Sequence, residues 1–181
     1  MLGANFIVSD LATRTDLPEV EESGRTFEEN AILKAVTISM LVPGLVVADD
    51  SGLEVEALGG APGIYSARYA GLQATDTANL AKLLAEIVAA GIDGEPAAQF
   101  RCVLAVARAG TLLQTFSGVV SGVIARVPTG AHGFGYDPVF KPEGSSLTFA
   151  AMGDHAKNAI SHRARAVEKL HEFLRALRPG A

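Results

Sequence analysis

Apolar positions recur along this chain with two different periods, and the change of period separates helices from strands. Helical spacing begins after Thr26 and stops at Pro43, which predicts an amphipathic helix between them. Thr26 and Glu29 precede the apolar run with the spacing of a capping box, in which Thr26 caps the helix and Glu29 reaches back. Two more stretches, 75–90 and about 156–177, carry apolar residues on one helical face.

Strand-like patterns lie between these helices. The short apolar run 45–48 is typical of a buried strand, and 99–107 and 112–126 alternate like paired strands with a turn near Ala109. The glycine-rich segment 58–63 predicts a loop. Helices interleave with strands, but two long strands follow one another directly. The pattern therefore predicts an α/β protein around a mixed sheet, organised as one domain over 1–181.

Two adjacent carboxylates follow the first predicted strand, in Ala48-Asp49-Asp50-Ser51-Gly52. Neighbouring residues on a strand point to opposite faces, so Asp49 and Asp50 cannot have the same role. In open-sheet α/β proteins ligands bind at strand ends, and carboxylate oxygens suit Mg²⁺, a cation that assists phosphate chemistry. The alternative interpretation is a turn or cap that contains two aspartates.

A glycine-rich aromatic segment, His132–Phe140, is the second candidate for chemistry. Its glycines let the backbone approach a flat ligand, and Phe134 or Tyr136 is suited to stack on a base. Asp137 precedes a proline, which favours an extended conformation that aims its carboxylate into the same space. The alternative is a loop whose aromatic residues belong to the core.

The third candidate is Lys157–Arg163 in the last predicted helix. Lys157 and Ser161 are four residues apart and share a helical face, with His162 and Arg163 just around the cylinder. Such donors suit a phosphate or a carbonyl-bearing base, and the alternative is a solvated helix face. Arg68, which follows the glycine-rich loop, is interpreted as mainly structural.

Composition narrows the class of protein. The chain has 181 residues and a formal net charge of −5, which argues against a general nucleic-acid binder. No apolar run approaches membrane-spanning length, and residues 1–16 lack a signal-peptide pattern. The single cysteine, Cys102, lies in a strand-like run and is expected in the core. We therefore expect a cytoplasmic protein that binds neither nucleic acid nor membrane.

Taken together, the motifs resemble those of the inosine triphosphate pyrophosphatase family. The resemblance implies a two-lobed α/β fold around a long twisted sheet, with the site between the lobes, and usually a homodimer. It also implies hydrolysis of deaminated purine nucleoside triphosphates (ITP, dITP, XTP) to a monophosphate and pyrophosphate, which cleanses the nucleotide pool. The residues that carry it stand in the family's order: Thr26–Ala31, Ala48–Leu53, Leu58–Arg68, Gly133–Pro138 and Ser161–Arg163.

The resemblance also implies roles for single residues. Asp50 corresponds to the proton acceptor and a Mg²⁺ ligand, Glu29 to a helix carboxylate near the metal, and Ser51 to a substrate contact. The remaining substrate-binding residues comprise the loop that holds the base and a cluster around the substrate: Phe134, Gly135, Tyr136, Asp137, Lys157, Ser161, His162 and Arg163. The residues themselves leave open which of Asp49 and Asp50 is the base.

The chain departs from the family pattern at its start. The family begins with a strand and a Ser/Thr-x-Asn-x-x-Lys-type loop that grips the triphosphate, whereas this sequence opens with Met1–Phe6. A late start codon and a natural short form both explain this, and either predicts weak pyrophosphatase activity. The alternatives are a purine nucleotide-binding protein without catalysis, a metal-dependent phosphatase that releases inorganic phosphate, and, last, a scaffold.

Overall fold

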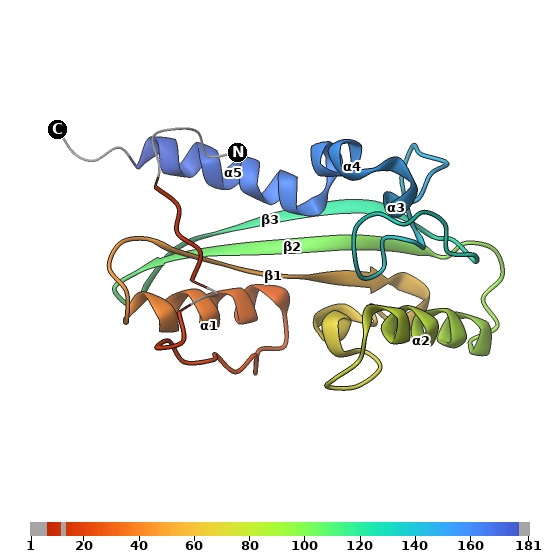
Figure 1. Cartoon of the computed structure of the whole chain (residues 1–181), viewed down its shortest axis with the longest axis horizontal. Coiled ribbons are helices and arrows are strands. Elements are labelled where there is room, and N and C mark those ends of the chain that lie inside the picture. Colours follow the sequence, from red (N-terminus) through yellow and green to blue (C-terminus); the bar gives the residue numbers. More distant parts are fainter. Residues whose placement is uncertain (1–6, 12–13, 178–181) are drawn as a thin grey trace.

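The computed structural model describes residues 7–11 and 14–177, and a four-stranded sheet in the order β1-β2-β3-β4 forms its centre (Figure 1). The strands are β1 (Val46–Val55), β2 (Ala97–Arg108), β3 (Thr111–Ile124) and β4 (Phe140–Pro142). Each neighbouring pair is antiparallel. The α/β class is confirmed, but the described strands contain no parallel pair of the kind that a mixed sheet requires.

Helices cover both sides of this sheet. Figure 1 shows α1 (Phe27–Ser39) and α2 (Asp76–Ala89) below the strands, with α4 (Asp154–Ile160) and α5 (His162–Ala176) above them. The short helix α3 (Phe149–Met152) precedes α4, and two 3₁₀ segments, η1 (Glu56–Leu58) and η2 (Gly63–Arg68), follow β1. Within the described ranges, no helix has the length and apolar character needed to span a bilayer.

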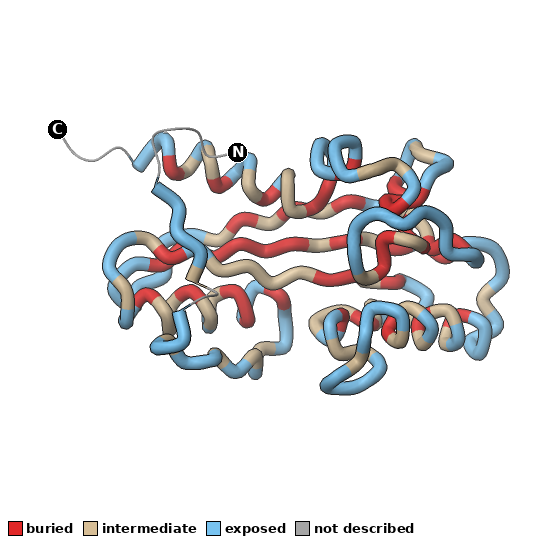
Figure 2. Tube along the Cα trace, in the orientation of Figure 1, coloured by how far each residue is buried: buried red, intermediate tan, exposed pale blue. Residues whose placement is uncertain are grey.

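The core divides into clusters at the two ends of the sheet. At one end, α1 packs on one face of β2, around Val103 and Ala105, while α5 packs on the other, around Leu104 and the buried Cys102. At the other end, α2 packs against the ends of β1, β2 and β3 and against three phenylalanines, Phe100, Phe140 and Phe149. The long strands run through both ends, as the buried positions in Figure 2 show. This arrangement agrees with the expected two-lobed shape.

Several local predictions are confirmed. Thr26 caps α1, because its Oγ1 accepts a hydrogen bond from the Glu29 amide at 3.1 Å. The Glu29 carboxylate returns to the Arg25 amide at 2.6 Å, one residue before the position that a standard capping box uses. The turn between β2 and β3 contains Ala109 and Gly110, both with positive φ (47° and 78°), as a tight hairpin requires.

The two aspartates do not end a strand, which corrects the interpretation of that segment as a strand end and turn. β1 continues through Asp49 and Asp50 to Val55. Gly52 is needed for a close approach instead: a Cβ there would lie 2.3 Å from Ser66 Oγ and 2.6 Å from the Gly63 carbonyl oxygen. The glycine therefore lets η2 pack directly onto β1.

The last helix is interrupted, although one continuous helix was expected. Ser161 adopts an extended conformation (φ −65°, ψ 155°) between α4 and α5. Its Oγ accepts a hydrogen bond from the Ala164 amide at 3.1 Å, so Ser161 is the N-cap of α5. Lys157 and Ser161 therefore do not share a face of one helix. The expected lack of a phosphate loop concerns Met1–Phe6, which lie outside the described residues.

Candidate active site

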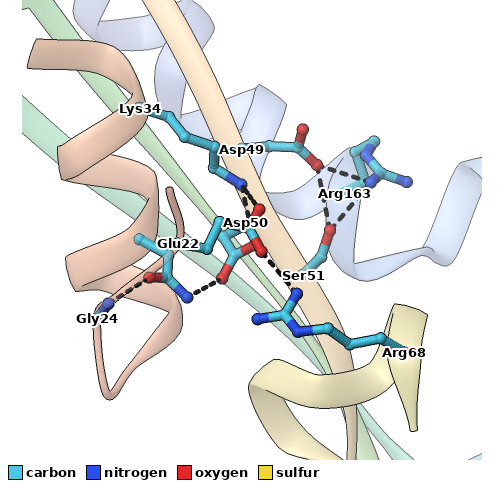
Figure 3. Close-up of polar contacts among 9 residues, drawn as sticks. Glu22, Gly24, Lys34, Asp49, Asp50, Ser51, Arg68 and Arg163 are labelled. Carbon is cyan, nitrogen blue, oxygen red and sulfur yellow. Dashed lines mark hydrogen bonds and ion pairs between the residues drawn. The ribbon is translucent and has the colours of Figure 1, made fainter. Parts of the chain in front are cut away.

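Asp49 and Asp50 point to opposite sides of β1, as their adjacent positions on a strand predict. Asp50 faces α1, where its Oδ1 accepts a hydrogen bond from Lys34 Nζ at 3.0 Å and its Oδ2 one from Asn30 Nδ2 at 3.2 Å. Asp49 faces the start of α5, where its Oδ2 accepts from Arg163 Nη2 at 2.7 Å. Figure 3 shows both sets of contacts on either side of the strand. One dipeptide therefore serves two separate polar clusters.

The two carboxyl groups also differ in acidity. Burial raises the pKa of Asp50, and the hydrogen bond from Lys34 offsets this only in part. Burial also acts to raise the pKa of Asp49, but the hydrogen bond and charge of Arg163 outweigh it, so the pKa falls below its ordinary value. Of the two, Asp50 is better suited to accept a proton, because its conjugate acid is the more stable.

Glu22 and two basic residues complete the cluster on the Asp50 side. Lys34 Nζ lies 2.9 Å from Glu22 Oε1 and 3.0 Å from Asp50 Oδ1, so two carboxylates share one ammonium group (Figure 3). Arg68 Nη1 pairs with the other Glu22 oxygen at 2.9 Å. Burial acts to lower the pKa of Lys34, but the hydrogen bonds that its ammonium group donates to Glu22 and Asp50 raise it overall. On this side of β1, two carboxylates are thus paired with two basic groups.

Sequence reasoning missed Glu22 and Lys34 and treated Arg68 as mainly structural. Lys34 lies one helical turn after Asn30 on α1, so both can reach Asp50 from the same face. That spacing was the available signal for Lys34. Glu22 lies in a segment without regular structure, where no periodic pattern marks it.

Glu29, expected near the metal, has a different set of contacts. Its carboxylate accepts a hydrogen bond from the Arg25 amide at the exposed start of α1. Within the described ranges, no group of three or more His, Cys, Asp or Glu side chains converges on a metal position. Two other carboxylates, Glu22 and Asp50, converge on the ammonium group of Lys34.

The aromatic loop forms one wall of a cavity of about 140 Å³ on the Asp49 side of β1. Phe134 is 63% exposed, whereas Tyr136 is buried and donates its hydroxyl hydrogen bond to the Ser66 carbonyl at 2.9 Å. Asp137 is buried too, and its Oδ2 accepts from Lys157 Nζ and, at 2.9 Å, from the Phe134 amide. The sequence-predicted residues around this cavity include Ser51, Gly135, His162 and Arg163.

The three residues of the Ser161-His162-Arg163 motif have different contacts. Ser161 caps α5, and Arg163 Nη2 bonds Ser51 Oγ at 3.0 Å as well as Asp49. The His162 ring stacks on Phe100 with centroids 4.8 Å apart. Burial, together with the charges of Arg163 and Lys157, lowers the pKa of His162 to about 4. His162 is therefore neutral at pH 7, and its buried Nδ1 has no hydrogen-bond partner among the described residues.

The fold and these side chains define an α/β protein in which an acidic strand separates a charged cluster from an aromatic pocket, an arrangement suited to binding a base and its phosphates. Comparison with known proteins identifies the family. The model of the Ham1 family matches residues 1–173, and the chain belongs to this family. The resemblance drawn from the sequence motifs is therefore confirmed.

Curated relatives are similar over most of the chain. A dITP/XTP pyrophosphatase of Bacillus licheniformis is 51% identical over 158 residues, which cover 87% of this chain and 80% of the relative. The enzyme of the same description from Bacillus subtilis is 49% identical over 172 residues, covering 94% and 86%.

Solved structures share the fold. A HAM1 protein from Coxiella burnetii superposes with a TM-score of 0.84 at 43% identity, covering 89% of this chain and 82% of that one. The Ham1 protein of Staphylococcus aureus gives a TM-score of 0.81 at 46% identity, covering 87% and 81%.

Proposed function

We propose that this protein hydrolyses deaminated purine nucleoside triphosphates, such as dITP, XTP and ITP, to the monophosphate and pyrophosphate. The observation that carries the proposal is the placement of Asp50 and Asp49 on one strand, between a cluster of charged groups and an aromatic pocket. A nucleotide whose base enters the pocket would bring its phosphates towards the Asp50 side. The curated relatives described as dITP/XTP pyrophosphatases support the same reaction.

A divalent cation, which we propose is Mg²⁺, fits the Asp50 side. The Glu22 and Asp50 carboxylates lie close together, since both are within hydrogen-bond distance of Lys34 Nζ. Mg²⁺ is commonly held by one or two carboxylates, with substrate phosphates and waters completing its coordination, so two acidic groups suffice. When bound, the ion would neutralise phosphate charge. We therefore propose Asp50 and Glu22 as its protein ligands, and Glu29 remains a prediction from the family resemblance.

For catalysis we propose that Asp50 accepts a proton from the water that attacks the α-phosphorus. The bond to the bridging oxygen breaks, and pyrophosphate leaves with that oxygen. Without a bound cation, burial raises the pKa of the Asp50 carboxyl, so it accepts a proton more readily than an exposed aspartate does. Lys34 and Arg68, both only partly exposed, are suited to stabilise the charge of the phosphates.

The base would enter the aromatic pocket, where Phe134 is free to stack on it. Lys157 and Arg163 line the same cavity and are hydrogen-bond donors only, as is suited to a 6-oxo group. Adenine presents a 6-amino group instead, so a donor aimed at that position is left unpaired. A buried polar group without a partner carries a large penalty, which favours the deaminated base.

The test is pyrophosphate release from dITP and dATP with Mg²⁺, using the wild type, Asp50→Asn, Glu22→Gln and Glu29→Gln. We expect release that prefers dITP, falls at least 100-fold in Asp50→Asn and needs more Mg²⁺ in Glu22→Gln. Glu29→Gln is the matched control for Glu22→Gln. An increased Mg²⁺ requirement in Glu29→Gln but not in Glu22→Gln would support the family-based ligand instead. Binding of deoxyinosine monophosphate without hydrolysis would indicate a binding protein.

We also propose a homodimer, because the family resemblance implies one. Light scattering at the concentration used for the activity assay tests this directly. A monomer that still hydrolyses dITP would show that the site is complete within one chain.

A further inference from the structure

We propose that Asp76, at the start of α2, is a positioning residue for the base. Its carboxylate holds the peptide between Phe134 and Gly135 and thereby sets the direction of the Phe134 ring. This role rests on the proposed function, in which Phe134 stacks on the purine. Asp76 itself belongs to a different part of the chain from the aromatic loop, and no motif of the sequence marks it.

The contact that carries the proposal joins the loop to the start of α2, and residues of both line the cavity. The Gly135 amide donates a hydrogen bond to Asp76 Oδ2 at 2.8 Å. The preceding amide, that of Phe134, donates to Asp137 Oδ2 at 2.9 Å. Two consecutive amides are therefore held by carboxylates from α2 and from the loop itself. Together these bonds orient the two peptide units on either side of the Phe134 Cα, from which the Phe134 side chain projects.

The Asp76 end of this bridge is well anchored. Thr75 caps α2 by accepting a hydrogen bond from the Ala78 amide at 3.2 Å. One turn into the helix, the side chain of Asn79 is buried and bonds the Ala70 amide at 2.7 Å and the Ala67 carbonyl at 3.0 Å. These bonds tie the start of α2 to the segment that forms another wall of the same cavity.

The loop, by contrast, depends on such bonds for its shape. Gly133 and Gly135 both have positive φ (75° and 60°), so the chain on either side of Phe134 is intrinsically flexible. The Phe134 ring is 63% exposed and has little packing to restrain it, apart from Lys157 Nζ at 4.6 Å from its centroid. Loss of the Asp76 bond should therefore leave the ring free to leave the stacking position, which weakens base binding.

The experiment compares Asp76→Ala with two matched variants. Asp76→Asn keeps a side-chain oxygen that can accept the Gly135 hydrogen bond, and Thr75→Ala weakens the same end of α2 without removing the contact. We expect Asp76→Ala to raise KM for dITP and the Kd for deoxyinosine monophosphate about tenfold, with kcat within twofold of wild type. Asp76→Asn should recover most of the affinity, whereas Thr75→Ala, which keeps the carboxylate and loses only part of its anchoring, should lower Tm and raise Kd much less than Asp76→Ala does.

Binding of the monophosphate, measured by calorimetry, separates this inference from the proposed activity. A wild type that binds deoxyinosine monophosphate but releases no pyrophosphate would refute the activity, and the effect of Asp76→Ala on Kd would still test the inference. Equal Kd values for wild type and Asp76→Ala would overturn it. So would an equal loss of affinity in Thr75→Ala, or a wild type that does not bind the monophosphate at all.

Discussion

Replacing Lys157 with methionine should leave the Asp137 carboxylate buried without its ammonium partner. The side chains of this ion pair are only 10% and 3% exposed, so water cannot take the place of Lys157. Asp137 would retain the hydrogen bond from the Phe134 amide at 2.9 Å. Methionine keeps an apolar stem of similar length, which can still pack near Phe149 and Phe134, so the substitution chiefly removes charge.

The size of the effect follows from this burial. Removing one partner of a buried ion pair destabilises a protein by about 3–5 kcal/mol. Because Asp137 keeps the hydrogen bond from the Phe134 amide, we expect Lys157→Met to lie at the lower end, about 3 kcal/mol. For a chain of this size, that loss corresponds to a fall in Tm of roughly 9 °C. Because Asp137 also holds the Phe134 amide, we expect base binding to weaken in the same variant.

Urea unfolding followed by circular dichroism measures the difference, with Lys157→Met, Asp137→Asn and the double variant side by side. The double variant should be more stable than Lys157→Met, because it no longer buries an unpaired charge. Arg14→Ala, which breaks an exposed ion pair, is the control and should leave the urea midpoint close to that of the wild type. A loss below about 1 kcal/mol in Lys157→Met, or no recovery in the double variant, would refute the reasoning.

Two further predictions concern stability. Gly52→Ala should lower the free energy of unfolding by about 2 kcal/mol in the same urea assay, because its Cβ would meet Ser66 Oγ at 2.3 Å; an unchanged midpoint would contradict the close approach. Burial lowers the pKa of His162 from 6.5 to about 4, so the unfolded chain binds a proton there before the native protein does. The stability that depends on a neutral His162 is fully present above pH 6.5 and is lost as the pH falls through about 4. The free energy of unfolding changes by about 3 kcal/mol at most over this range. His162→Phe, which retains a ring beside Phe100, should show a smaller loss of stability over this pH range, and an identical pH profile would contradict it.

The elements that the sequence predicts correctly are those with local causes. The cap at Thr26, the helix from Asp76 to Ala89 and the hairpin at Ala109-Gly110 each depend on residues within one or two turns of one another. Their boundaries can therefore be read from spacing and turn chemistry alone.

The errors have non-local causes. Gly52 looks like a turn residue in the sequence, but it is required by Ser66, which packs against it from η2. The antiparallel pairing of β1 with β2 depends on how α2 returns the chain, which no local pattern specifies. The error at Ser161 has a local cause instead. Ser161 is an N-cap, but the helical spacing of apolar residues continues on both sides of it and masks this signal.

The candidate site was predictable from motifs only where its residues are themselves distinctive. Asp49 and Arg163 come together from positions 114 residues apart, and the sequence marks both because each stands in a motif. Glu22 and Lys34 also meet at Asp50, yet neither stands out in the sequence, since a glutamate in an irregular segment and a lysine on an amphipathic helix are common features.

The alternation of β1 places the two adjacent aspartates in different environments. Asp50 lies with Lys34 and Glu22 on the charged side, whereas Asp49 is bound to Arg163, which lines the aromatic cavity together with Ser51. Arg163 lowers the pKa of Asp49, and burial raises that of Asp50, so the strand carries one carboxylate kept ionised by a guanidinium group and one that accepts a proton more readily. In the proposed function, a substrate whose base lies in the aromatic cavity and whose phosphates lie at the charged cluster would extend past this dipeptide. Under this proposal, β1 would link recognition of the base to the chemistry at the phosphates through two neighbouring side chains.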